Sequence, residues 1–175
     1  MKIGVISDTH LSAPSGLTSS ITHWLRNSRT LDEIRNILAT YFAGVERIIH
    51  AGDFVDETVV EMLQEFAPLE AVHGNADGPQ IQKRFPSHKI LELGGFRIGL
   101  THGDGAPHGI MGRVRQHFDQ VDAIVFGHTH QPLNMRHNGI LYFNPGSPTD
   151  RLFAPCHSIG MLELTQSIRG ELICL

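Results

Sequence analysis

Short apolar runs recur along this chain, and each is followed within a few residues by a polar side chain of a type that binds metal ions. The runs are Ile3–Ile6, Ile48–Ile49, Leu69–Val72, Ile98–Leu100 and Ala123–Phe126, and the polar residues after them are Asp8 and His10, Asp53, Asn75, His102, and His128 and His130. Runs of this kind are typical of buried strands. Because side chains at the carboxyl ends of neighbouring strands converge on one crevice, the pattern predicts the metal site of a hydrolase.

The first half of the chain alternates predicted strands with predicted helices. Amphipathic helices are expected at Thr30–Phe42 and Asp56–Phe66, and Thr30 with Glu33 forms a capping-box pattern at the start of the first. Strands are expected at Lys2–Ser7, Arg47–His50 and Leu69–His73. This rhythm predicts parallel strands joined by right-handed crossovers.

The second half is richer in strands. Gly94 and Gly95 separate two apolar segments as a two-residue hairpin turn does, and one helix is expected at Ile110–Phe118. The predicted strands are Lys89–Leu93, Phe96–Thr101, Val121–Phe126, Leu133–Arg136, Ile140–Phe143, Ser158–Leu164 and Ile168–Cys174. We therefore expect one α/β domain over residues 1–175, with two sheets packed face to face and helices outside.

Composition limits the possible functions. The 175 residues are 41% hydrophobic and carry a net charge of −4, so no global positive field attracts nucleic acid or a membrane surface. No apolar run reaches membrane-spanning length and no leader pattern opens the sequence, which predicts a cytoplasmic location. Cys156 and Cys174 form no Cys-x-x-Cys motif, which argues against a disulfide framework and for a reducing compartment.

The oxygen-bearing candidates are weak signals one by one. Asp8 and His10 stand two residues apart, so both side chains point the same way on an extended segment, although Asp8 could instead cap a helix. Asp53 follows Gly52, which permits close backbone approach, and its two oxygens could bridge two cations; capping the next helix is the alternative. Asn75 offers a neutral oxygen, but Gly-Asn more often forms a turn.

The histidines are more specific. His128 and His130, like Asp8 and His10, are two residues apart, and a His-x-His after a strand indicates a metal site more often than a pair of loop histidines. The seven candidates exceed the three protein ligands that a catalytic zinc usually takes. They suit two ions about 3.5–4 Å apart, with a bridging hydroxide that attacks a phosphate ester. Mn²⁺ is the expected ion, and Fe, Zn, Ni or Mg are alternatives.

Taken in this order, the motifs resemble those of the calcineurin-like metallophosphoesterases. The matching segments are Asp8-Thr9-His10, Gly52-Asp53-Phe54-Val55-Asp56, Gly74-Asn75-Ala76-Asp77, His102-Gly103 and Gly127-His128-Thr129-His130. The short chain and the segment Asn144-Pro145-Gly146-Ser147 are most similar to the small bacterial and archaeal phosphodiesterases of that superfamily. The resemblance covers residues 1 to about 147.

The resemblance implies a four-layer α/β/β/α sandwich and a metal-dependent phosphoesterase, with a phosphodiester as the favoured small substrate. It implies one ion held by Asp8, His10, Asp53 and His130, and a second held by Asp53, Asn75, His102 and His128, so that Asp53 bridges them. A homo-oligomer is a further expectation from the family.

The chain departs from the family pattern at one position. Many members carry a His directly after Gly-Asn that protonates the leaving group, whereas this chain has Ala76, so good leaving groups should be favoured. Asp77 is predicted to act in catalysis beside Asp53 and Asn75 as a substitute proton donor, and its structural alternative is hydrogen bonding within its loop. Other nearby candidates are His73, Asp104 and His108.

Two further functions stay open. One is a non-catalytic metal-binding scaffold of this fold, similar to the retromer subunit that has lost parts of the site; the intact Asp-x-His and His-x-His motifs favour the enzyme. The other is a nuclease, which the acidic balance disfavours. The loop Ser12–Ser20, with His23 and Trp24 after it, could line the site, and Arg113 and Arg115 could steer phosphate, although a solvated helix face is the alternative.

Overall fold

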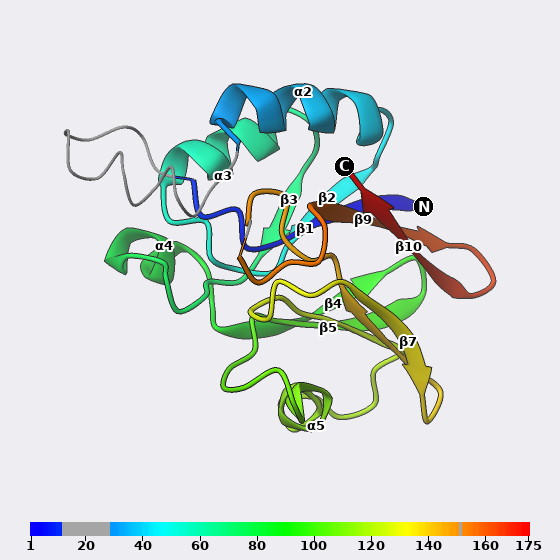
Figure 1. Cartoon of the computed structure of the whole chain (residues 1–175). Coiled ribbons are helices and arrows are strands. Elements are labelled where there is room, and N and C mark those ends of the chain that lie inside the picture. Colours follow the sequence, from blue (N-terminus) through cyan, green and yellow to red (C-terminus); the bar gives the residue numbers. More distant parts are fainter. Residues whose placement is uncertain (12–28, 151) are drawn as a thin grey trace.

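Two five-stranded sheets pack face to face, with helices outside them, in the computed structural model, which describes residues 1–11, 29–150 and 152–175 (Figure 1). Both sheets are mixed: the first has three parallel strands at one side and an antiparallel pair at the other, and the second has a parallel centre and two antiparallel edges. The predicted α/β architecture is therefore confirmed. The loop Ser12–Ser20, His23 and Trp24 lie outside the described residues.

The first sheet follows the predicted strand–helix alternation. Its order is β10 (Ile168–Cys174), β9 (Ser158–Leu164), β1 (Lys2–Ile6), β2 (Arg47–His50) and β3 (Leu69–Ala71). The strands β1, β2 and β3 are parallel, as predicted, and α2 (Leu31–Tyr41) and α3 (Glu57–Gln64) connect them. The predicted capping box is present at the start of α2, where Thr30 and Glu33 each accept the other's backbone N–H.

The second sheet is formed by later segments of the chain. Its order is β4 (His88–Leu93), β5 (Phe96–Thr101), β6 (Ala123–Val125), β8 (Ile140–Asn144) and β7 (Leu133–His137). The predicted turn joins β4 to β5, and Gly94 and Gly95 there have φ of +57° and +83°. The helix α5 (Ile110–Arg115) lies on the outer side of this sheet (Figure 1).

Three apolar layers hold the sandwich together. One lies between the sheets, one joins α2 and α3 to the first sheet, and one joins α5 to the second. The end of α2 packs closely on β1 at Gly4, where a Cβ would lie 2.7 Å from the ring of Phe42. Phe42 is therefore a packing residue. No helix among the described residues is long and apolar enough to cross a membrane.

Two features differ from the sequence predictions. The helix α4 (Pro79–Arg84) was not predicted, because Ile81 is its one buried residue and it shows no amphipathic period; Pro79 at its first turn is the signal it offers. The expectation of no disulfide was wrong: Cys156 and Cys174 are bonded, with Cα atoms 6.1 Å apart. The antiparallel pairing of β9 with β10 brings them together, which sequence spacing alone did not show.

Candidate metal centre

The candidate ligands come from both sheets and meet where the two sheets end together. Asp8 and His10 follow β1, and Asp53 follows β2, whereas His102 follows β5 and the His-x-His pair follows β6. Backbone bonds tie the first two loops: Asp8 N donates to Gly52 O at 3.0 Å and His10 N donates to Asp53 O at 3.1 Å. The site is thus assembled across the sandwich rather than along the edge of one sheet.

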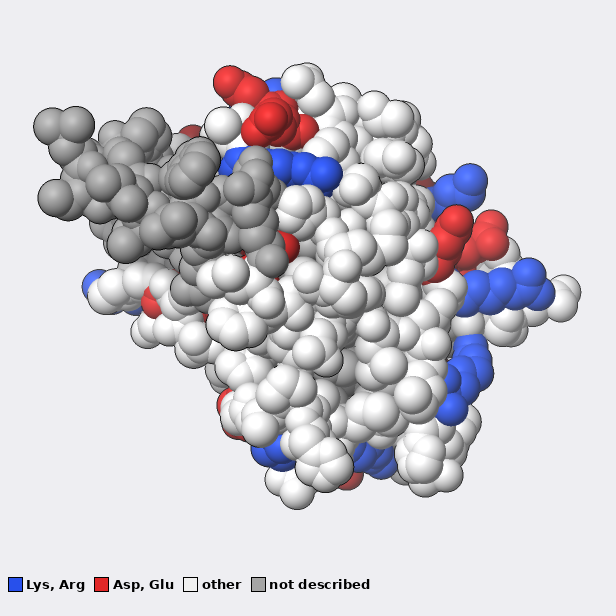
Figure 2. Space-filling model, viewed as in Figure 1, with Lys and Arg blue, Asp and Glu red and all other residues white. Residues whose placement is uncertain are grey.

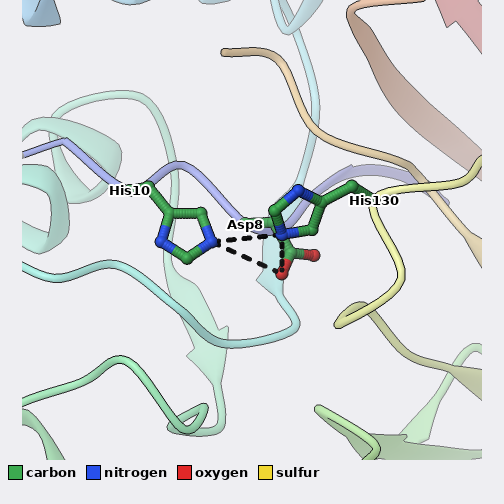
Figure 3. A group of neighbouring side chains, drawn as sticks. All are labelled: Asp8, His10 and His130. Carbon is green, nitrogen blue, oxygen red and sulfur yellow. Dashed lines mark hydrogen bonds and ion pairs between the residues drawn. The ribbon is translucent and has the colours of Figure 1, made fainter. Parts of the chain in front are cut away.

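Five of the seven candidates form a compact buried cluster. His130 Nε2 lies 3.2 Å from both Asp8 Oδ1 and His10 Nε2 (Figure 3). Asp53 Oδ2 lies 3.4 Å from His10 Nε2 and 3.3 Å from His102 Nε2. Two overlapping groups of potential ligands result, one of Asp8, His10 and His130 and one of Asp8, Asp53 and His102.

The remaining two candidates, Asn75 and His128, lie together beside the cluster and are less buried. Asn75 Oδ1 is 3.0 Å from His128 Nδ1. His128 Nε2 is 2.9 Å from Gly105 O, and since a carbonyl only accepts, Nε2 carries the hydrogen of the neutral ring. The lone pair of His128 Nδ1 therefore faces the amide oxygen of Asn75, as two ligands of one cation would.

The backbone at the ligand positions is strained. A positive φ is uncommon outside glycine, and such outliers gather at functional sites. The ligand candidates with φ between +44° and +68° are Asp8, His10, Asp53, His128 and His130. Each of these costs conformational free energy, so the surrounding structure must hold the side chains in place for a purpose other than stability.

Asp77 supplies part of that support. Its carboxylate accepts backbone N–H groups from Asp53 at 2.9 Å, Val55 at 2.8 Å and Gly74 at 2.8 Å. Asp77 is buried and does not line the cavity beside the cluster. This is the loop-bonding role that was the alternative to proton donation, so the structure gives Asp77 a supporting position and does not favour its predicted catalytic one.

The cluster attracts positive charge. Burial by itself raises the pKa of Asp8 and Asp53, but the neighbouring histidines outweigh it and hold both pKa values below the usual range. Burial lowers the pKa of His102, but Asp53 and Asp8 outweigh it and raise the pKa to about 9. The same opposition, with Asp8 and Asp150 as the carboxylates, raises the pKa of His130.

One buried atom lacks a partner that a cation would provide. His102 Nδ1 is 2.7 Å from Ala51 O and must carry the hydrogen, because a carbonyl only accepts. His102 Nε2 is buried and makes no hydrogen bond within the described residues. A divalent ion would satisfy that nitrogen and the surrounding carboxylates, so the residues fit such an ion.

A cavity of about 280 Å³ opens beside the cluster. It is lined by Asp53, Asn75, Gly105, Pro107, His128, Thr129, His130, Gln131 and Phe153. Arg113 does not reach it as a phosphate ligand: its guanidinium bonds Asp104 and the carbonyl oxygen of His108 and so fixes the loop before α5. On the face shown in Figure 2, Lys and Arg lie scattered and form no single patch.

Sequence reasoning missed several residues of the site. Ser147 Oγ donates to Asp8 O at 2.8 Å, Thr149 Oγ1 donates to Thr9 O at 2.8 Å, and Asp150 contacts His130. The motif ending in Ser147 was noted as a resemblance, but nothing in the spacing assigned Asp150 a role. His50 was also missed; burial lowers its pKa to about 3, so it is a neutral residue beneath the site.

A two-sheet α/β sandwich that ends in a buried carboxylate–imidazole cluster is the arrangement expected of a metallophosphoesterase domain. The chain belongs to the calcineurin-like phosphoesterase superfamily, whose domain model matches residues 1–167. The expected resemblance is thus confirmed.

Individual relatives agree with this assignment. A probable metallophosphoesterase of Methanocaldococcus jannaschii is 34% identical over 176 residues, which cover 99% of this chain and 81% of the relative. A phosphodiesterase of the same organism is 28% identical over 185 residues, covering 99% of each chain. Vps29 of Entamoeba histolytica, solved in complex with Zn²⁺, shares the fold with a TM-score of 0.64 at 22% identity, covering 99% of each chain.

Proposed function

We propose that this protein is a phosphodiesterase that works with two divalent metal ions bound at the cluster. The spacing of the potential ligand atoms carries the proposal. Atoms that bind one ion at about 2.0–2.2 Å lie roughly 3–3.5 Å from one another. His130 Nε2 lies 3.2 Å from Asp8 Oδ1 and from His10 Nε2, Asp53 Oδ2 lies 3.4 and 3.3 Å from His10 and His102 Nε2, and Asp8 Oδ1 is 3.9 Å from His10 Nε2.

The assignment of residues to ions is the one that the family resemblance implies, and these contacts are compatible with it. Asp8, His10, Asp53 and His130 would hold one ion, and Asp53, Asn75, His102 and His128 the other. Asp53 Oδ2 faces His10 and His102 alike, so this single oxygen is placed to bridge, while Oδ1 accepts the N–H of Ala76 at 2.7 Å. Bound ions would supply positive charge to the phosphoryl oxygens and lower the pKa of a bound water.

The preference for diesters rests on the resemblance to phosphodiesterases, one of which is 28% identical over 99% of this chain, and the preference for a good leaving group rests on the lining of the cavity. Apart from residues assigned to the ions, the described residues of its lining offer Thr129 and Gln131 as polar side chains and no acid that could protonate a leaving group. Asp77 is held by three backbone N–H groups. A substrate whose leaving group departs without a proton, such as an activated diester, would suit this site. Asn75 at the cavity wall would orient the ester. Mn²⁺ remains the first choice of ion.

The test is hydrolysis of bis-p-nitrophenyl phosphate beside p-nitrophenyl phosphate. Metal-stripped protein receives Mn²⁺, Mg²⁺, Zn²⁺ or Ni²⁺, and Asp53→Ala serves as the control. Metal-restored turnover that prefers the diester and vanishes in Asp53→Ala supports the proposal. Preference for the monoester would overturn the diester assignment.

A non-catalytic scaffold is the second candidate, because the fold is shared with Vps29. Protein that binds two ions yet hydrolyses neither ester with any metal would favour it.

The single domain over residues 1–175, the homo-oligomer and the cytoplasmic location stay predictions. Cell fractionation tests the location, for which the Cys156–Cys174 bond favours an oxidising compartment instead.

A further inference from the structure

A buried carboxylate lies on the far side of one proposed metal ligand. Asp150 is 1% exposed, and its Oδ2 lies 2.6 Å from His130 Nδ1. An ionised carboxylate only accepts hydrogen bonds, so Nδ1 of His130 carries the hydrogen and donates it to Asp150. The neutral ring then has its lone pair on Nε2, the atom that faces Asp8 and His10 (Figure 3).

The backbone around Asp150 fixes the position of its carboxylate. Oδ1 accepts the N–H of Leu152 and Oδ2 accepts the N–H of Phe153, both at 3.0 Å. The Asp150 N–H donates to Ser147 Oγ at 3.1 Å, and Ser147 in turn donates to the carbonyl of Asp8. The carboxylate is therefore tied to the same loop that supplies ligands on the opposite side of the His130 ring.

Two other proposed histidine ligands, His102 and His128, donate to backbone carbonyls rather than to a carboxylate. His102 Nδ1 donates to the carbonyl of Ala51, and His128 Nε2 donates to the carbonyl of Gly105. A carboxylate partner makes the imidazole a better ligand than a neutral carbonyl does, because it stabilises the positive charge that the ring gains when it binds a cation. Asp150 thus distinguishes the two groups of ligands.

We propose that Asp150 is a positioning residue that fixes the tautomer and orientation of His130 and thereby makes the Asp8–His10–His130 site the tighter of two metal sites. The inference rests on metal binding at the proposed centre, but not on turnover. Loss of an outer partner of a metal-binding histidine weakens metal affinity by about 10–100-fold. The loss should fall on one binding step, since Asp150 touches neither His102 nor His128.

The test is calorimetric titration of metal-stripped protein with Zn²⁺. Asp150→Ala should weaken the tighter step about 10–100-fold and leave the weaker step within a factor of about two. Asp150→Asn keeps one acceptor oxygen without the charge and should lose less than Asp150→Ala. Ser158→Ala is the control: it removes a buried side-chain bond to the Pro145 carbonyl, outside the ligand loops, and should leave both affinities unchanged.

A second readout separates positioning from loop stability. In the Zn²⁺-loaded wild type, the Nδ1–H proton of His130 should give a low-field resonance that shifts upfield in Asp150→Asn and disappears in Asp150→Ala. Unchanged affinities in folded Asp150→Ala, or equal weakening of both steps there and in Ser158→Ala, would overturn the inference. Wild type that binds no Zn²⁺ would instead refute the proposed metal centre itself, which keeps the two failures apart.

Discussion

Replacement of Gly127 by alanine should damage the site through a single methyl group. Gly127 lies where the second sheet meets the loop after β1, and a Cβ there would lie 2.5 Å from Asp8 Oδ2 and closer still to Ser7 Oγ. Ordinary non-bonded contact is about 3.5 Å, so the Asp8 carboxylate must retreat by about 1 Å. The φ of Gly127 lies outside the left-handed region, so this clash, and not backbone strain, is the cause.

The structure gives the size of the effect. The Asp8 carboxylate accepts Ser7 Oγ at 2.7 Å and the His128 N–H at 3.0 Å, and a 1 Å retreat breaks or stretches both bonds. Hydrogen bonds to charged groups contribute about 1.5–3 kcal/mol each, so Gly127→Ala should lose about 3–6 kcal/mol of stability. At about 2–4 °C per kcal/mol for a chain of this size, the melting temperature should fall by at least about 6 °C.

The assay is thermal unfolding of metal-free protein, followed by Zn²⁺ titration below the melting transition. Gly112→Ala is the control, because a Cβ on Gly112 in α5 meets nothing within 4 Å. That variant should match or exceed the wild type by up to about 1 kcal/mol, since alanine favours helix. If Gly127→Ala melted within about 2 °C of the wild type and bound Zn²⁺ equally well, the close contact between the two loops would be refuted.

Three further results are expected. Zn²⁺ must displace the proton from His102, whose pKa the carboxylates raise to about 9, so apparent affinity should rise about tenfold per pH unit from pH 7 to 8. In the metal-free protein the raised pKa of His102 stabilises the folded state, fully below a pH of about 6.5, and this contribution is lost as the pH rises through about 9. A Zn²⁺ affinity that did not change with pH would contradict the raised pKa on which both expectations rest. Phe153 is 62% exposed and lines the cavity, so Phe153→Ala should raise KM for nitrophenyl esters several-fold with kcat little changed; an unchanged KM would exclude ring contact. Reduction of Cys156–Cys174, which are 18 residues apart, should cost about 3 kcal/mol, and a thiol count of two in untreated protein would show that the bond does not form.

Much of the fold could be predicted because local signals agreed with the final packing. The strand Arg47–His50 and the pair β9 and β10 lie within the predicted bounds, and the Thr30–Glu33 capping box placed the start of α2. Where a segment had no apolar period, as in α4, prediction failed. The structure also shows that the ligand candidates meet between two sheets, which the spacing of apolar residues could not indicate.

The candidate site, like the fold, could be predicted from the sequence only in part. Motif spacing brought out the ligand candidates, because Asp, Asn and His are side chains that bind metal ions and here they follow successive apolar runs. The supporting residues follow no such rule: Asp150 contacts His130 from 20 residues away, and Asp77 bonds backbone groups whose direction no sequence pattern specifies. The catalytic role of Asp77 stays a prediction, and its three backbone contacts favour the supporting alternative.

Crystals soaked in Mn²⁺ and measured at the manganese absorption edge would test the dinuclear centre most directly. The account predicts two anomalous peaks about 3.5–4 Å apart on either side of Asp53, one beside Asp8, His10 and His130 and one beside Asn75, His102 and His128. A single peak under saturating Mn²⁺, or two peaks that Asp53 does not bridge, would contradict it.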